Sequence, residues 1–120
     1  MNTLKPVSAD RKIVKPEDGY RSEFEVQAFL YSALLQLGAD VRGELKCADE
    51  RLRETCRFDL VIFDGADAIE ILEVKSAPVK HKNGVEATRQ GAKYRKFGIP
   101  VTFIYGMKDA ETYLNRNFWR

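Results

Sequence analysis

Two strongly apolar segments joined by an Asp-Gly pair constrain the fold of this chain more than any other feature. The first, RFDLVIF at residues 57–63, and the second, AIEILEVK at residues 68–75, are rich in strand-forming residues. Asp64-Gly65 lies between them and is typical of a tight hairpin turn. Because both segments are almost continuously apolar, we expect neighbouring strands in a sheet that is covered on both faces.

The pattern before this hairpin predicts one helix and one strand. Apolar residues at spacings of three and four predict a helix that begins after Ser22 and ends at Gly38, with Glu25 completing a capping box. Its apolar positions are Val26, Leu30, Ala33, Leu34 and Leu37. In residues 41–47 apolar and polar side chains alternate, which predicts a short strand. The polar residues 48–56 predict either a long hairpin loop or a single helical turn.

The pattern after the hairpin predicts two helices and a strand. Residues 85–97 are expected to form a helix that ends before Gly98, and residues 100–106 a strand. Asp109 is a candidate cap for a last helix from Ala110 to about Asn115. The order is therefore helix, three strands, helix, strand, helix. It predicts an α/β fold with a central mixed sheet flanked by helices.

Length and composition set further limits. The chain has 120 residues, so we expect a single domain over residues 20–120, preceded by an arm over residues 1–19 that has no period and could be mobile. No apolar run has the length of a signal peptide or a membrane span, which favours a cytoplasmic location. One histidine and two cysteines exclude two-histidine metalloproteases and disulfide scaffolds.

Charge is unevenly distributed in the second half of the chain. Residues 59–73 hold five acids and no base, whereas residues 75–96 hold seven basic residues and one acid. An acidic cluster can bind a divalent cation, and a basic flank can bind a polyanion. The alternative is that both are ordinary solvated surface.

Three charged residues lie within the two most apolar segments. Asp59 is in the first, and Glu73 and Lys75 are in the second, where alternation points both to the same face and Val74 to the other. Charged groups are costly to bury without partners, and a divalent metal offsets that cost for two carboxylates. Alternatively, Glu73 and Lys75 emerge at the strand end and face solvent.

The first helix offers a third acid. At 100° per residue, Glu23 lies at the edge of the apolar stripe and is expected to face the sheet, whereas Glu25 faces water. Glu23 could then join Asp59 and Glu73. Its position is also explained by the favourable effect of an acid at a helix N-terminus.

Together these residues resemble the PD-(D/E)XK nuclease superfamily, over about residues 22–106. The matching series is Glu23-x-x-Val26-Gln27-x-x-Leu30, Gly38, Phe58-Asp59, Glu73-Val74-Lys75 and Gln90-x-x-x-Tyr94, with 13 residues between Asp59 and Glu73. The chain looks most similar to small stand-alone members such as Holliday-junction resolvases and virus-type replication-repair nucleases. It departs from the motif at Phe58, where the nominal proline would stand. The resemblance implies a restriction-endonuclease-like core.

The resemblance also implies roles for individual residues. Asp59, Glu73 and the carbonyl of Val74 would bind Mg²⁺ or Mn²⁺, and Glu23 a second metal or a metal-bound water. Lys75 would orient the attacking water, and Gln90 would line the site. The implied activity is hydrolysis of DNA phosphodiester bonds to 5′-phosphate and 3′-hydroxyl ends, in repair, recombination, restriction or phage DNA processing.

The basic segment supplies candidate contacts to nucleic acid, weighed against plain solvation. These candidates are Lys80, His81, Lys82, Arg89, Lys93, Tyr94 and Lys96. Cutting both strands of a duplex would need a homodimer, because a chain of this size presents one site. Two other functions stay open: a catalytically silent nuclease-fold module that binds nucleic acid or acts as a scaffold, and an unrelated α/β protein.

Overall fold

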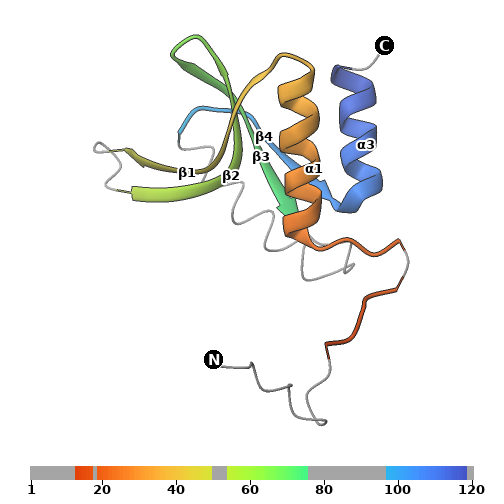
Figure 1. Ribbon diagram of the computed structural model, residues 1–120. Helices are drawn as coiled ribbons and strands as arrows, with labels where there is room; N and C mark the ends of the chain where they lie inside the picture. The colour runs from red at the N-terminus through yellow and green to blue at the C-terminus, as the bar shows by residue number, and fades with distance from the viewer. Residues whose placement is uncertain (1–12, 18, 50–53, 76–96, 119–120) are drawn as a thin grey trace, which may run out of the picture.

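The protein is described by a computed structural model, which covers residues 13–17, 19–49, 54–75 and 97–118 (Figure 1). Its elements in chain order are α1 (Glu23–Gln36), β1 (Asp40–Asp49), β2 (Glu54–Asp64), β3 (Asp67–Lys75), β4 (Val101–Tyr105) and α3 (Gly106–Asn117). Most of the N-terminal arm and the helix predicted for residues 85–97, apart from its last residue, lie outside the described residues.

The four strands form one mixed sheet in the order β1-β2-β3-β4. β1 pairs antiparallel with β2 and β2 antiparallel with β3, whereas β3 and β4 are parallel. A parallel pair needs a long crossover, which here runs from residue 76 to residue 100. The expected α/β class with a mixed sheet is confirmed, and the described elements follow the expected order.

α1 forms where its sequence predicts. The Ser22 side chain accepts a hydrogen bond from the Glu25 N–H at 3.2 Å, and the Glu25 carboxylate accepts one from the Ser22 N–H at 2.9 Å. Gly38 ends the helix with a φ of 86°, a left-handed conformation that glycine adopts without strain. The first four apolar positions are buried, but Leu37 is exposed because it is the C-cap, where the chain leaves the helix.

Removing the capping hydroxyl should destabilise the protein measurably. Ser22→Ala leaves helix N–H groups without their acceptor, which typically costs about 1 kcal/mol and should lower Tm by about 4 °C. Ser32→Ala, at an exposed position inside the same helix, is the matched control and should not lower Tm. Equal melting temperatures of the two variants in thermal unfolding followed by circular dichroism would contradict this role of Ser22.

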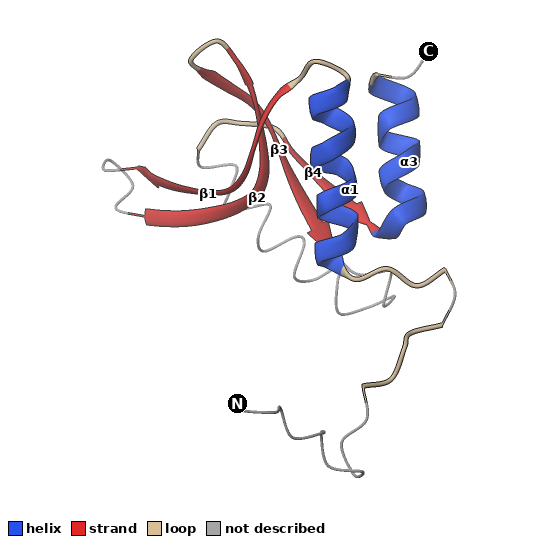
Figure 2. Cartoon of the chain, viewed as in Figure 1, coloured by secondary structure: helices blue, strands red, loops and turns tan. Residues whose placement is uncertain are grey.

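Both described helices cover the same face of the sheet and contact each other (Figure 2). The core on that face joins α1 and α3 to alternate strand residues. These strand residues are Val41, Leu60, Ile62, Leu72, Val74 and Ile104. On the opposite face, a second cluster forms around Phe58, Val61 and Ile71, and the rings of Phe58 and Phe97 meet edge to face at 5.6 Å. Buried residues therefore lie on both faces, as the apolar segments predict.

One of the two hairpins forms as predicted, and the other is longer than predicted. The Asp64-Gly65 turn is confirmed, with Gly65 at a φ of 61°. β1 and β2 extend beyond their apolar segments, because Ala48 and Asp49 pair through their backbones with Thr55 and Glu54. The loop or turn predicted for residues 48–56 is therefore wrong at both of its ends.

The last helix begins earlier than its sequence suggests. α3 starts at Gly106, and Asp109 is not its cap but lies within the first turn. The Asp109 carboxylate accepts a hydrogen bond from the Tyr105 N–H at 2.8 Å, so it still satisfies a backbone donor at the helix start. Phe118 packs against the core, with its ring 6.1 Å from that of Tyr113. Neither described helix has the length and apolar character needed to cross a membrane.

Candidate active site

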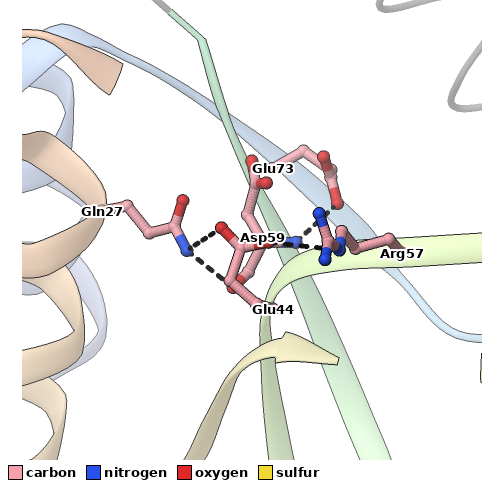
Figure 3. A network of polar contacts seen from close by, with 5 residues as sticks. All are labelled: Gln27, Glu44, Arg57, Asp59 and Glu73. Carbon is pink, nitrogen blue, oxygen red and sulfur yellow. Dashed lines mark hydrogen bonds and ion pairs between the residues drawn. The ribbon is translucent and has the colours of Figure 1, made fainter. Parts of the chain in front are cut away.

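The candidate site lies where the backbone pairing of β2 with β3 ends. The last paired residues are Leu60 and Leu72, and Asp59 and Glu73 follow them. Beyond this point side chains replace backbone carbonyls as acceptors. The Val74 N–H donates to Asp59 Oδ2 at 2.8 Å. The Asp59 N–H donates to Glu73 Oε1 at 3.1 Å (Figure 3). Each carboxylate is thus fixed to the neighbouring strand, and the two are brought together.

The pair is removed from water to an unusual degree for two acids. Glu73 is only 4% exposed, and Asp59 is half-buried. Burial, together with the nearby Asp59 charge, raises the pKa of Glu73 to about 8. Burial also raises the pKa of Asp59, against the opposing effect of its hydrogen bond from Val74. The alternative in which Glu73 faces solvent is therefore wrong.

The raised pKa of Glu73 makes the stability of the metal-free protein depend on pH. The unfolded chain loses this proton near pH 4.5, whereas the folded protein holds it up to about pH 8. The stabilisation is therefore complete below the unfolded pKa and is lost as the pH rises through the folded one. We expect Tm in EDTA to fall between about pH 5 and about pH 9.

Glutamine at position 73 mimics the protonated acid and keeps an acceptor for the Asp59 N–H. Glu73→Gln should therefore remove most of the fall in Tm with pH. Glu111→Gln, at an exposed position of α3, should leave the fall intact. If wild type and Glu73→Gln show the same dependence of Tm on pH, the assigned environment of Glu73 is wrong.

The two carboxylates fit a hard divalent cation. Each uses one oxygen to accept a backbone N–H and keeps a second oxygen, and Mg²⁺ prefers one or two carboxylates supplemented by waters and phosphates. A divalent ion would also relieve the repulsion between two buried acids. Among the described residues, no three His, Cys, Asp or Glu side chains converge to hold a metal. Within this part of the chain, the carboxylates that could hold such an ion together are therefore Asp59 and Glu73.

The neighbouring strand bends beside the pair. Glu44, which lies in β1 opposite Asp59, has a φ of 52°, a left-handed conformation that is strained for a glutamate. Its charge raises the pKa of Asp59, so the two carboxylates are close. Gln27 of α1 donates through Nε2 to Glu44 Oε1 at 3.2 Å and to the Asp59 carbonyl at 3.1 Å, and Arg57 pairs with Glu44 at 3.7 Å (Figure 3).

Gln27 and Glu44 were not predicted to be functional from the sequence. Gln27 belongs to the series that resembles the nuclease superfamily, but it lies at the border of the apolar stripe of α1 and no role was assigned to it. The one signal for Glu44 is the preceding Gly43, because a glycine inside a strand often marks a bend or a bulge. Arg57, in the apolar segment, contacts Glu44 rather than either member of the pair.

The other predicted site residues have different outcomes. Lys75 ends β3 half-buried, and its charge lowers the pKa of both Asp59 and Glu73, so it lies near both. Glu23 is the first residue of α1 and its side chain is exposed, although it was expected to face the sheet. The proposed role of the Val74 carbonyl stays a prediction. Outside the described residues lie Lys80, His81, Lys82, Arg89, Gln90, Lys93, Tyr94 and Lys96.

Comparison with known proteins gives no further guide to this site. No protein-family model matches the chain, and neither a curated protein nor a solved structure is significantly similar to it. The roles of these residues are therefore argued from their geometry and chemistry.

Proposed function

We propose that this protein is a metal-dependent deoxyribonuclease that hydrolyses phosphodiester bonds at Asp59 and Glu73. The observation that carries the proposal is the pairing of the buried Glu73 carboxylate with the half-buried Asp59 carboxylate, each anchored by a backbone N–H of the other's strand. A site that pairs like charges in this way is typical of catalytic and metal centres. The resemblance to PD-(D/E)XK nucleases, with its implied restriction-endonuclease-like core, points to the same chemistry.

Mg²⁺ or Mn²⁺ bound at the pair would polarise the phosphate and acidify a water. The residues supply the rest of the mechanism. Asp59 and Glu73 hold their oxygens in place through the two backbone hydrogen bonds, so little reorganisation is needed when charge develops. Lys75, close to both acids, positions the attacking water and offsets the negative charge that grows on the phosphate oxygens.

The network around Glu44 supports this arrangement. Gln27 ties the first half of α1 to the backbone of Asp59, so the helix restrains the strand that carries the first acid. Arg57 compensates part of the Glu44 charge, although both side chains are largely exposed and the pair contributes little to stability. Glu23, in the adjacent first turn of α1, is proposed to hold a metal-bound water or a second ion.

The proposal is tested by cleavage of a labelled DNA panel containing a single strand, a duplex, a flap and a four-way junction. Wild type and Lys75→Ala are compared in Mg²⁺, Mn²⁺ and EDTA, with Lys108→Ala, at an exposed position of α3, as control. We expect wild type and the control to cut at least one substrate with metal, and Lys75→Ala to be at least about a hundredfold slower. Cleavage in EDTA, or equal rates for Lys75→Ala, would refute the mechanism. Metal-independent DNA binding without any cleavage would favour a silent binding module.

A further inference from the structure

A pocket of about 320 Å³ lies between α1 and β1. Its lining residues are Phe24, Gln27, Ala28, Tyr31, Gly43, Glu44 and Leu60. Phe24, Ala28 and Tyr31 follow one another at helical spacing and form one wall. The opposite wall includes Gly43, where the missing side chain leaves space: a Cβ there would lie in contact with Tyr31, 3.8 Å from its Cδ1. This volume suits one small planar molecule rather than a helix of a partner.

The two aromatic rings are not needed by the core. Phe24 is 76% exposed and Tyr31 is 37% exposed, whereas the buried positions of α1 lie on its other side. Exposed aromatic rings beside a pocket are typical of binding sites, because their faces stack on flat ligands at little conformational cost. The wall of the pocket therefore favours a ligand with an aromatic ring.

The polar end of the pocket presents hydrogen-bond acceptors. Both N–H groups of the Gln27 amide are used, toward Glu44 and toward the Asp59 carbonyl. Its Oε1 accepts no hydrogen bond from any residue within the described ranges. With the Glu44 carboxylate beside it, this end offers acceptors to a ring that carries N–H donors. Nucleobases combine such donors with an aromatic face.

The pocket adjoins the candidate active site through Gln27 and Glu44. Gln27 lines the pocket and also donates to the Asp59 carbonyl (Figure 3), and the charge of Glu44, which lines the pocket too, acts on the Asp59 carboxylate. We propose that this pocket binds one unstacked nucleobase of the DNA strand whose phosphodiester lies at Asp59 and Glu73. This inference rests on the proposed function and adds to it that the substrate has an unpaired or extruded base next to the cut.

The test asks whether one nucleobase of the DNA and the aromatic ring of Tyr31 contact each other, by removing each alone and both together. Binding of a labelled single-stranded oligonucleotide about 12 nucleotides long is measured by fluorescence anisotropy in Ca²⁺, for the intact strand and for strands that lack one base at each position in turn. For wild type, loss of the base at one position should weaken binding about tenfold. For Tyr31→Ala, binding should already be weaker by a similar factor, and removing that base should have no further effect.

Two variants serve as controls. Tyr31→Phe keeps the ring and should bind as wild type does. Leu37→Ala removes an apolar side chain of similar exposure, 38%, at the far end of α1, and should also bind normally. Thermal unfolding establishes that Tyr31→Ala is folded, and Phe24→Ala provides a second variant of the same wall if it is not.

Three outcomes would overturn the pocket proposal. The first is equal binding of the oligonucleotide by wild type and the folded pocket variants. The second is that loss of the base still weakens binding in Tyr31→Ala. The third is that wild type is a dimer in light scattering and Tyr31→Ala is a monomer. The last result would mean that a second copy covers the pocket. Failure of the nuclease assignment is seen separately, as no metal-dependent hydrolysis by wild type of bis(p-nitrophenyl) phosphate, a diester without a base.

Discussion

Asp59→Asn is expected to lower metal-dependent DNA cleavage by at least about a thousandfold while leaving the fold intact. Asparagine keeps an oxygen that can accept the Val74 N–H at the position of Asp59 Oδ2, so the anchor to β3 is retained. What it loses is the negative charge that the cation needs. Cleavage rates are measured under single-turnover conditions, beside Asp67→Asn, a change at an exposed residue at the start of β3.

Glu73→Gln should have an effect of similar size, because the two acids act as a unit. The double variant should then be hardly slower than either single variant, since groups that hold one metal are strongly non-additive. An Asp59→Asn enzyme within about tenfold of wild type, or a double variant whose losses multiply, would mean that the pair is structural.

The largest expected effect on stability comes from the core beneath the site. Leu72 is fully buried and pairs with Leu60. Directly after this pair, the carboxylates of Asp59 and Glu73 accept the backbone N–H groups of the neighbouring strand. Leu72→Ala should lower the free energy of unfolding by about 2–5 kcal/mol, because it removes buried methyl groups and leaves a cavity. Ile69→Ala in the same strand, where the side chain is 48% exposed, should cost much less.

Urea unfolding in EDTA measures both variants. The comparison also tests whether the sheet positions the site, since Leu72→Ala should weaken cleavage well below its melting temperature. If Ile69→Ala proves as destabilising as Leu72→Ala, the assignment of the two faces of β3 is wrong.

The central strands and the acids in them could be predicted because two independent rules agree there. Alternation separates Val74 from Glu73 and Lys75, and the apolar sequence makes a buried Glu73 costly without a partner, but a Glu73 that faces solvent stayed open as an alternative. The Asp64-Gly65 turn alone would place Asp59 opposite Leu72, and a register shift between Ile62 and Phe63 moves it opposite Glu73. Neither that shift nor the exchange of backbone hydrogen bonds between the acids follows from the sequence.

Other features depend on three-dimensional context and leave little trace in the sequence. The left-handed conformation at Glu44 falls between the paired residues Gly43 and Leu45, and only Gly43 hints at it in the sequence. The polar ends of β1 and β2 are held by backbone hydrogen bonds, which are almost independent of side-chain type. α3 begins at Gly106, directly after β4 ends at Tyr105. The helix propensity of glycine is low, so the sequence does not indicate a helix start there. The link from Gln27 to Asp59 spans 32 positions and is invisible to any local pattern.

Under the proposed function, the pair sets metal binding against the stability of the metal-free protein. Metal-free, the protein keeps Glu73 protonated near neutral pH, since two buried charges side by side would be costly. A cation has to displace that proton, so its affinity should increase as the pH rises toward about 8. Cleavage should rise over the same range for this reason.

The most direct test of the central claim is calorimetric titration of Mn²⁺ into wild type and Asp59→Asn at about pH 7, in two buffers of different ionisation enthalpy. Wild type should bind the ion and release roughly one proton on binding, and Asp59→Asn should bind at least about tenfold more weakly. Equal affinity in the two proteins, or no binding to wild type, would show that Asp59 and Glu73 do not form a metal centre.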